Sequence, residues 1–385
     1  MFATYITKTP EETIQLGQRL AQRLVGGDAV LLVGELGTGK THFTKGLAAG
    51  IGILMTIKSP TYTYVNKFLI SDLQLTPDPY QYPTKNPKSE IRNPKQTQKS
   101  KTQNLKPKLK TFYHYDLYRL KEGDDFTSIG LHESFEDSDA ITVVEWADRL
   151  GGHFPKQYII IQFTEVSEGR KIEIEFHRPT ILDEWAIEAY YDEWATPMHV
   201  REHCRIVTHV AMEVARAMMR KGEIINATLL YTSGMLHDMA RVCDMMTFGR
   251  DKIHEPISKT KWSKWLKLRE QYSGKKHPEI AYHQLQERGF SETAEVIRLH
   301  QTISMGNEMG AFDTIEKKLI NYADKRVKHR EIVSIQERFR DGNERYGSSN
   351  SPELSQLFVD LEQATLEMER ELFRGLDIKQ GDITK

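Results

Sequence analysis

The 385-residue sequence has few cysteines, almost no net charge and no long apolar run, and each shortage excludes a class of protein. Two cysteines, Cys204 and Cys243, are too few for a disulfide framework in a chain of this size. No apolar stretch approaches the length that spans a bilayer. A formal net charge of -1 gives no overall basic field, so composition does not demand nucleic-acid binding. The first residues, MFATYITKTPEETIQL, lack the basic segment and apolar core of a secretion signal, so we expect a cytoplasmic protein without membrane contact.

The most informative motif is VLLVGELGTGKT, in which an apolar run is followed by a glycine-rich loop and a helix-like segment. This is the pattern of a phosphate-binding loop between a strand and a helix. Backbone N–H groups of such a loop surround phosphates, Lys40 is placed to reach the β and γ phosphates, and the Thr41 hydroxyl is placed to ligate magnesium. The motif therefore predicts a site for a nucleoside triphosphate with Mg²⁺. Its predicted nucleotide-binding residues are Gly34, Glu35, Gly37, Thr38, Gly39, Lys40, Thr41 and His42.

Two acidic residues fall at the ends of later apolar strands, Asp116 after FYHY and Glu145 after ITVV. Ligands of open α/β sheets bind beyond the carboxyl ends of the strands, so we expect both carboxylates near the bound phosphates. One would hold magnesium through water and the other would orient the attacking water. The aromatic, β-branched segment 61–65 also has strand character, and YIIIQF and KIEIEF predict a closing hairpin.

Composition divides the chain into two domains, 1–178 and 197–385, joined by a linker at 179–196. Within the first domain, residues 71–110 contain six of the 14 prolines, and residues 81–110 carry nine Lys or Arg against one Glu. Such a segment buries too little apolar surface to offset its ordering entropy, so we predict a disordered insertion. A solvated loop is the favoured interpretation, and RNA attraction is the alternative.

GELGTGKT, KSPTYTYV, HYDLYRL and VVEWADRL, in that order, resemble the bacterial ATPase family TsaE, which serves the synthesis of threonylcarbamoyladenosine (t6A) in tRNA. The resemblance implies ATP with Mg²⁺ at the phosphate loop and catalytic roles at Lys40, Asp116 and Glu145. It also implies a nucleotide contact at Trp146 and a nucleotide-sensing switch at 59–63. The partners that it implies are TsaD-like and TsaB-like subunits, with tRNA contacted indirectly.

The second half is mostly helical by periodicity and carries histidines and aspartates within apolar helices. Imidazoles together with carboxylates suit a divalent metal such as Fe, Mn, Co or Mg, and a carboxylate shared by two ions would bridge a metal pair. A lone histidine is usually structural, but an interleaved set favours a metal centre. The predicted metal ligands are His203, His237, Asp238, His277, His300 and Asp324, with Thr41 as the separate magnesium ligand of the first domain.

The order His, His-Asp, Asp resembles the HD phosphohydrolase superfamily over about residues 197–346. The additional histidines make it most similar to the YqeK-type proteins, which hydrolyse diadenosine tetraphosphate at a two-metal site. The resemblance implies an all-α domain, one or two transition metals such as Fe, Mn or Co, and a catalytic role for Asp238. It assigns His277 and His300 to the second metal position. Arg241 stands where relatives carry lysine, and its guanidinium would hold phosphate.

A final helix is predicted at 351–375, with an apolar stripe that docks on its own domain or, alternatively, on a second copy of the chain in a homo-oligomer. Together these features predict a two-domain fusion: an α/β P-loop NTPase sheet followed by an all-α HD domain. The function they favour is bifunctional, an ATPase for tRNA t6A modification and a metal-dependent phosphohydrolase acting on a small nucleotide, either diadenosine tetraphosphate or a mononucleotide. The alternatives are a regulatory nucleotide switch with low turnover, and an HD half that serves as a metal-bound interaction module.

Overall fold

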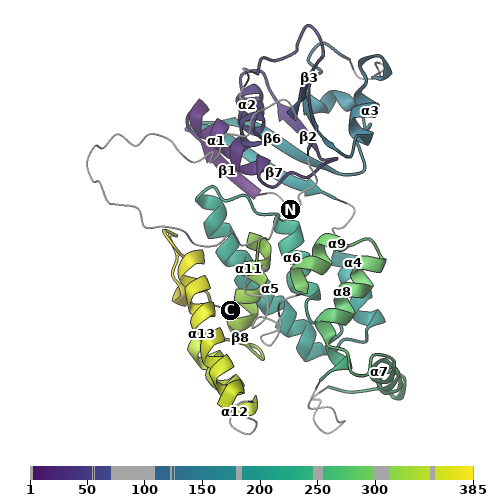
Figure 1. The fold of residues 1–385 in the computed structure, drawn as a ribbon, viewed down its shortest axis with the longest axis vertical. Coiled ribbons are helices and arrows are strands. Elements are labelled where there is room, and N and C mark those ends of the chain that lie inside the picture. Colours follow the sequence, from purple (N-terminus) through teal and green to yellow (C-terminus); the bar gives the residue numbers. More distant parts are fainter. Residues whose placement is uncertain are drawn as a thin grey trace, which may run out of the picture. The chain divides into compact units, whose positions relative to one another are not determined.

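The computed structural model shows two compact units, one formed by Ile6–Ile174 and the other mainly by Glu175–Lys385 (Figure 1). It describes residues 3–384 except 54, 56, 71–108, 122–123, 125, 179–183, 246–254, 299, 301–311 and 347–351. The predicted disordered insertion at 71–110 therefore lies outside the described residues, apart from its last two. Within the described part of the chain, no helix has both the length and the apolar character needed to cross a bilayer.

The amino-terminal unit is built on one seven-stranded sheet with the strand order β1-β7-β6-β2-β5-β4-β3 (Figure 1). Its central strand β2 is parallel to β5 and β6, β4 is parallel to β5, and β3 is antiparallel to β4. The predicted α/β class is confirmed, and the predicted hairpin is the neighbouring pair β6 and β7. The strands are β1 (Ala3–Thr7), β2 (Ala29–Gly34), β3 (Val65–Leu69), β4 (Thr111–Asp116), β5 (Ala140–Glu145), β6 (Tyr158–Val166) and β7 (Gly169–His177).

Parallel register places both predicted acidic residues at one edge of this sheet. Asp116, the last residue of β4, is paired with Glu145, the last residue of β5, and Glu145 also lies beside Leu32 of β2. The phosphate loop leaves β2 at the same carboxyl edge. Strand pairing alone therefore brings together segments of the chain that are far apart in sequence.

Close helix packing supports the segment that follows the phosphate loop. Helix α1 (Pro10–Ala21) crosses α2 (Lys40–Gly50) where each helix has a glycine. A Cβ atom on Gly46 would lie 2.1 Å from the backbone oxygen of Ile14, and one on Gly17 would lie 2.4 Å from that of Phe43. Only glycine permits this approach, and it fixes the helix that begins at Lys40. The remaining helical segments of this unit are η2 (Thr127–Ile129), α3 (Leu131–Glu136) and η3 (Ala147–Leu150).

The strand expected at 61–65 is wrong for all but its last residue, because β3 begins only at Val65. The backbone N–H groups of Thr63 and Tyr64 both donate to the carbonyl oxygen of Pro60, at 3.0 and 2.7 Å. Tyr64 has a left-handed φ of 62°. A turn that starts at Pro60 thus outweighs the strand propensity of the aromatic and β-branched residues.

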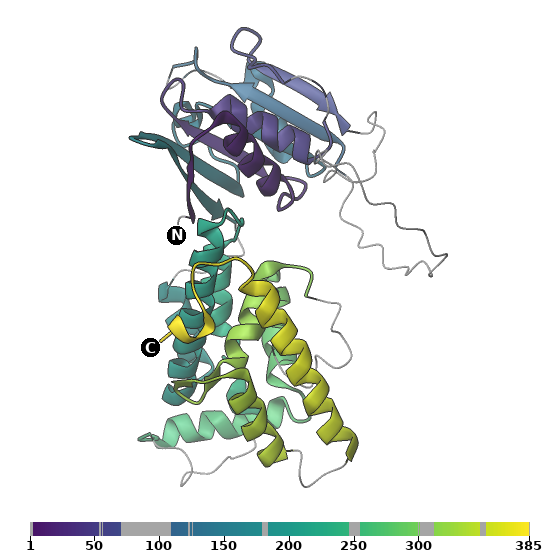
Figure 2. The ribbon, with the colours of Figure 1, turned by 90° about the vertical axis from the view of Figure 1, so that its left-hand side faces the viewer.

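The carboxy-terminal unit is helical, as predicted, with one two-stranded ribbon added (Figure 2). Its apolar core is formed largely by α4, α5, α6, α8 and α9. The elements are α4 (Glu184–Glu193), α5 (Met198–Arg220), α6 (Ala227–Leu236), η4 (Arg241–Cys243), α7 (Lys259–Gln271), α8 (His277–Glu287), α9 (Ser291–Ile297), α11 (Ile315–Lys325), β8 (Val327–Lys328), β9 (Glu331–Ile332), α12 (Ile335–Tyr346), α13 (Pro352–Leu372) and η6 (Gln380–Asp382).

Part of the segment predicted as a linker, 179–196, forms helix α4 and belongs to this helical core. Helix α4 buries Ile187, Tyr190 and Tyr191, and Trp194 follows in the same cluster. The Tyr191 hydroxyl donates to the backbone oxygen of Met235 at the end of α6. Residues 179–183 lie outside the described residues.

The predicted terminal helix is α13, the yellow helix of Figure 2, and it packs on α11 and α12 of its own unit. Leu361, Thr365 and Leu372 are buried in this packing. Two carboxylates of α13 contact α11: Glu371 pairs with Lys318 at 2.6 Å, and Glu369 accepts a hydrogen bond from Tyr322 at 2.9 Å. The docking of the helix on its own domain is confirmed.

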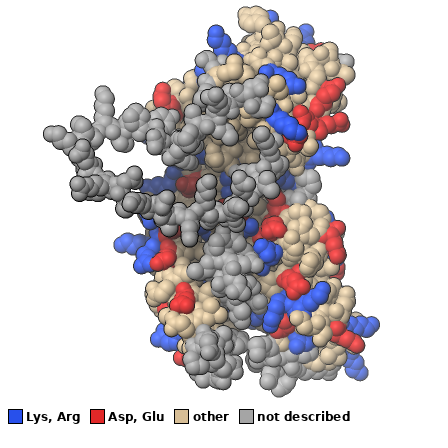
Figure 3. Space-filling model, viewed as in Figure 1, with Lys and Arg blue, Asp and Glu red and all other residues tan. Residues whose placement is uncertain are grey.

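Charged side chains of both signs are interspersed over the described residues on the face shown in Figure 3. Exposed ion pairs among the described residues include Arg205 with Glu188 and Arg220 with Asp377. Pairs of this kind contribute little to stability. The mixture agrees with the formal net charge of -1.

Candidate functional sites

The phosphate loop turns from β2 into α2 through three glycines with positive φ angles. These angles are 148° at Gly34, 85° at Gly37 and 103° at Gly39, and L side chains rarely adopt them. Lys40 is the first residue of α2, so the unpaired N–H groups and positive dipole end of the helix begin at the loop. Of the other predicted residues, Glu35 is exposed, Thr38 is buried with its hydroxyl on the backbone oxygen of Glu35 at 2.8 Å, and Thr41 and His42 are half-buried.

Lys40 is held by the loop itself. Its ammonium donates to the backbone oxygens of Gly34 and Glu35 at 2.6 and 2.8 Å, and it lies 3.9 Å from the centroid of the Trp146 ring. Burial lowers the pKa of Lys40, and the charge of Glu145 opposes that shift. Phosphate oxygens would replace the two carbonyl oxygens as partners of the ammonium. Trp146, predicted from the family resemblance, is therefore a direct neighbour of Lys40.

Glu145 is a buried carboxylate that joins the loop helix to two neighbouring strands. Its Oε2 accepts a hydrogen bond from Thr41 Oγ1 at 2.9 Å, and its Oε1 accepts one from Thr44 Oγ1 at 3.3 Å. The same Oε1 lies 2.9 Å from Nε2 of His114, which is fully buried. Glu145 therefore lies in direct contact with Thr41, the predicted magnesium ligand.

No motif of the sequence assigns a role to His114, and its contact with Glu145 was not predicted. Its Nδ1 has no hydrogen-bond partner among the described residues. A carboxylate accepts hydrogen bonds, so we assign the proton of His114 to Nε2, which donates to Glu145. The signal in the sequence was the position of His114 two residues before Asp116, on the same face of one strand.

Asp116 has a different set of partners from Glu145. Its Oδ2 accepts hydrogen bonds from the hydroxyls of Ser59 and Thr61, the latter at 2.7 Å, and its Oδ1 accepts one from the Tyr118 N–H at 2.9 Å. Ser59 and Thr61 belong to the segment that resembles a nucleotide-sensing switch. The two acids therefore have different contacts. Glu145 contacts the helix that follows the phosphate loop, and Asp116 contacts the segment that resembles a switch.

All six residues predicted as ligands of the second metal site converge in the helical unit. They come from five separate segments, and each one is buried or partly buried. The set is His203 from α5, His237 and Asp238 directly after α6, His277 at the start of α8, His300 after α9, and Asp324 from α11.

Five of the six side chains form two overlapping groups that share Asp238. In the first, candidate ligand atoms of His203, His237 and Asp238 lie within 4.8 Å of one another, and the same limit holds for Asp238, His277 and His300 in the second. Asp238 Oδ1 is 2.7 Å from His277 Nε2 and 3.3 Å from His300 Nε2. A carboxylate common to both groups is the arrangement that a bridged metal pair requires.

Asp324 completes the first group. Its Oδ1 lies 3.1 Å from Nε2 of His203 and 3.8 Å from Nε2 of His237. Its other oxygen accepts a hydrogen bond from Lys325 at 2.8 Å. Three residues from α5, α6 and α11 therefore meet around one carboxylate oxygen.

The four imidazoles all point Nε2 toward the carboxylates, because Nδ1 faces an acceptor in each case. The acceptors are the His329 oxygen for His203 at 3.3 Å, the Gly234 oxygen for His237 at 2.7 Å, Asp244 for His277 at 2.9 Å, and the Ile297 oxygen for His300 at 2.6 Å. Each imidazole can direct an Nε2 lone pair at the site once that nitrogen carries no proton. Four lone pairs directed at two carboxylates form a donor set for divalent metal ions.

The electrostatics keep both carboxylates ionised. Burial raises the pKa of Asp238, but the charge of His277 and hydrogen bonds from His277 and His300 outweigh it and hold that pKa well below its usual range. Burial also raises the pKa of Asp324, but the charge of Lys325 and the contact with His203 outweigh this effect and lower the pKa. Burial also lowers the pKa of His300 to about 4, so its imidazole is neutral near pH 7.

Asp244 contacts a predicted metal ligand, and the sequence did not reveal this contact. Its two oxygens lie 2.9 and 3.0 Å from His277 Nδ1, and one of them accepts the His277 backbone N–H at 3.2 Å. Arg241, predicted to hold phosphate, instead lies 2.9 Å from the same Nδ1 and 3.5 Å from Asp244. Asp244 therefore sets the orientation of a predicted metal ligand.

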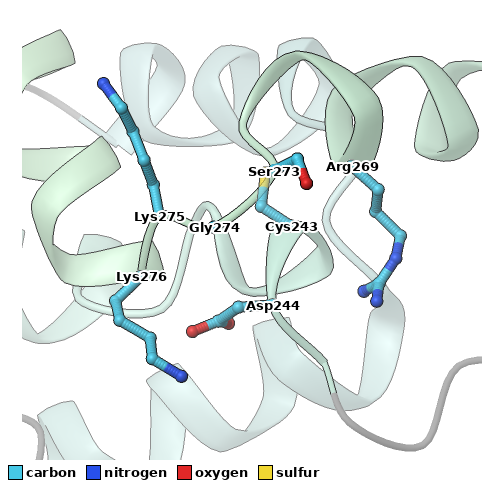
Figure 4. Close-up of a pocket in the computed structure, with 7 residues that line it drawn as sticks. All are labelled: Cys243, Asp244, Arg269, Ser273, Gly274, Lys275 and Lys276. Carbon is cyan, nitrogen blue, oxygen red and sulfur yellow. The ribbon is translucent and has the colours of Figure 1, made fainter.

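A small cavity of about 260 Å³ lies beside Asp244 (Figure 4). Its lining is mostly polar, and the Asp244 carboxylate points into it, whereas the Lys275 side chain extends away. The buried thiol of Cys243 also lines it, and burial raises the pKa of Cys243 to about 12, which keeps the thiol protonated. The lining residues are Cys243, Asp244, Arg269, Ser273, Gly274, Lys275 and Lys276.

Comparison with known proteins matches the two units to two different families. The family model for "Threonylcarbamoyl adenosine biosynthesis protein TsaE" matches residues 7–86 and 95–172, and the HD domain model matches residues 200–328. The HD match identifies the domain without naming a substrate, so the YqeK-type resemblance stays a prediction.

Several curated relatives, each called tRNA threonylcarbamoyladenosine biosynthesis protein TsaE, are similar to part of this chain. The one from Nostoc sp. is 32% identical over 177 residues, which cover 45% of this chain and 85% of the relative. The Bacillus subtilis protein is 29% identical and covers 40% and 73%, and the Haemophilus influenzae protein is 28% identical and covers 38% and 68%. The crystal structure of Bacillus subtilis YdiB is 24% identical, covering 44% of this chain and 82% of its own, with a TM-score of 0.29.

Proposed function

Because the chain belongs to the TsaE family through its amino-terminal unit and carries an HD domain after it, we propose that it is a bifunctional protein. The amino-terminal unit hydrolyses ATP for the t6A modification of tRNA. The HD domain is a metal-dependent phosphohydrolase of a small nucleotide. The proposed partners of the first activity are TsaD-like and TsaB-like subunits, with tRNA contacted through them, and the proposed location is the cytoplasm.

The contacts of the phosphate loop support ATP hydrolysis. Lys40 neutralises phosphate charge once its ammonium exchanges two carbonyl partners for phosphate oxygens. Thr41 and Glu145, already hydrogen-bonded to each other, would hold Mg²⁺. Bound Mg²⁺ would supply charge neutralisation at the β and γ phosphates. Asp116 would connect the γ-phosphate of bound ATP to the proposed switch segment, because it accepts hydrogen bonds from Ser59 and Thr61.

A steady-state ATPase assay tests this half, run with and without TsaD-like and TsaB-like proteins. We expect slow turnover alone and faster turnover in the complex, because a single phosphate loop commonly needs a partner to complete its site. Turnover that stays undetectable in both conditions, with ATP binding retained, would support the alternative of a nucleotide switch.

The donor set of the helical unit fits divalent metal ions. His237 Nε2 is buried and has no hydrogen-bond partner among the described residues, although its Nδ1 is satisfied. His277 Nε2 and His300 Nε2 lie 3.1 Å apart, each with its own Nδ1 facing an acceptor. His277 Nε2 also lies 2.7 Å from Asp238 Oδ1. A buried His237 Nε2 without a hydrogen-bond partner among the described residues, next to the carboxylate shared by both ligand groups, is the observation that carries the phosphohydrolase proposal.

The residues around this centre would position both the metal ions and the reacting phosphate. His203, His237, Asp238 and Asp324 would hold one ion, and Asp238 with His277 and His300 would hold the second. Bound metal would activate water and polarise the phosphoryl oxygen. Asp238 would fix the spacing between the two positions, and burial would exclude bulk water from them.

Chelation and reconstitution test the second activity in the full-length protein. Mn²⁺, Fe²⁺ or Co²⁺ is supplied to chelated protein with a panel that includes diadenosine tetraphosphate and mononucleotides. We expect hydrolysis of at least one compound, loss on chelation and recovery on metal return. Metal binding without hydrolysis of any compound would favour the interaction-module alternative.

A further inference from the structure

Lys325, the last residue of α11, has a fully buried side chain between the two groups of candidate metal ligands. The residue is 1% exposed. Its ammonium donates to Oδ2 of Asp324 at 2.8 Å and to the backbone oxygen of His300 at 2.6 Å. An ammonium has no lone pair and is not a metal ligand, so its effect must come through its partners.

The contact between Lys325 and Asp324 determines which oxygen of the Asp324 carboxylate is available to bind a metal ion. Oδ2 is occupied by Lys325, whereas Oδ1 faces His203 Nε2 at 3.1 Å and His237 Nε2 at 3.8 Å. A free aspartate can bind a cation through one oxygen or both. With Oδ2 engaged by an ammonium, Asp324 offers a single oxygen to the first group.

The contact with His300 fixes a ligand of the second group. His300 follows α9, and its Nδ1 faces the backbone oxygen of Ile297 at 2.6 Å, which orients the ring. Lys325 then ties the His300 backbone to the end of α11. Both constraints hold Nε2 near Asp238, at 3.3 Å from Oδ1.

We propose that Lys325 is a positioning residue for both metal positions: it makes Asp324 a ligand through Oδ1 alone and holds His300 in the second group. This inference rests on the metal centre of the proposed function. It predicts that removal of the ammonium leaves the first ion bound through the histidines of α5 and α6, while the second ion is lost because His300 is no longer tethered.

Mn²⁺ titration of the full-length protein, with bound metal counted by mass spectrometry, tests the effect of Lys325→Met. We expect the number of bound Mn²⁺ ions per chain to fall from two to one. Lys325→Gln keeps a donating group and should retain part of the second ion. Lys318→Met is the matched control, because it removes an ion pair with Glu371 from the same helix and should keep two ions. Two ions in Lys325→Met would overturn the inference, since a merely structural lysine would lower stability without changing the number of bound ions.

A crystal structure of the wild-type protein with bound Mn²⁺ tests the role of Lys325 even if Lys325→Met fails to fold. The inference requires Mn²⁺ on Asp324 Oδ1 with Oδ2 still on the Lys325 ammonium. Mn²⁺ bound through both oxygens of Asp324 would overturn the inference and leave the metal centre standing. Absence of Mn²⁺ from all six ligands would instead overturn the proposed metal centre.

Discussion

Replacing Asp244 by alanine removes the carboxylate that orients His277, and it should weaken one metal position more than the other. The carboxylate makes three contacts with His277, at 2.9 and 3.0 Å to Nδ1 and at 3.2 Å to the backbone N–H. A hydrogen bond to a charged group contributes about 1.5–3 kcal/mol. Loss of such an outer partner costs about 10–100-fold in metal affinity, which is about 1.4–2.7 kcal/mol. The two ranges agree, so we expect a loss of about this size.

Calorimetric titration with Mn²⁺ measures the effect on each ion. In Asp244→Ala, the Mn²⁺ ion bound by Asp238, His277 and His300 should bind more weakly. The affinity for the Mn²⁺ ion bound by His203 and His237 should stay unchanged. Asp244→Asn keeps an acceptor oxygen for Nδ1 and should lose less.

The control for the loss of a carboxylate from this unit is Asp377→Ala, because Asp377 pairs with Arg220 on the surface at 3.0 Å. It should bind Mn²⁺ like the wild type. Equal weakening of both ions in Asp244→Ala, or wild-type binding of both, would refute the role assigned to Asp244.

Three further predictions follow from the same contacts. Glu145→Gln should lower ATP turnover about 100-fold or more while ATP binding changes little, because the carboxylate at Thr41 acts on water or metal; wild-type kcat would reject that role. Deletion of 71–110 with a short Gly/Ser bridge should leave thermal stability and ATP affinity unchanged, and a collapse in Tm would show that the segment is an ordered element. Mn²⁺ affinity should fall as the pH is lowered from about 8 to about 6. Burial lowers the pKa of His203 and His277, but the nearby Asp324 and Asp238 raise it by more, so both imidazoles bind protons that the metal must displace. An affinity that does not change with pH would contradict this prediction.

Motifs with fixed chemistry were the predictable part of both sites. The phosphate loop could be recognised because glycine positions, Lys40 and Thr41 lie within one short segment. The placement of Asp116 beside Glu145 followed from the rule that parallel strands share a carboxyl edge, and the register confirms it. The six ligands of the helical unit could be proposed together because histidines and aspartates are interleaved in apolar helices, and their order resembles a known family.

Contacts between distant segments could not be predicted. Asp244 and His277 are 33 residues apart, and α7 with its flanking segments lies between them. His114 meets Glu145 only through the register of β4 and β5. Helix α4 was missed inside the linker, although Ile187, Tyr191 and Trp194 have the spacing of a buried helix face.

The most direct test of two independent active sites in one chain is to measure both activities in Lys40→Ala and Asp238→Ala of the full-length protein. Lys40→Ala should abolish ATP hydrolysis and leave metal-dependent phosphohydrolase activity at the wild-type level, because its ammonium contacts the phosphate loop and Trp146 within its own unit. Asp238→Ala should empty the metal centre, abolish phosphohydrolase activity and leave ATP hydrolysis intact, since Asp238 is the carboxylate shared by both ligand groups. Loss of both activities in either variant while it remains folded, or persistence of phosphohydrolase activity in Asp238→Ala, would contradict the account.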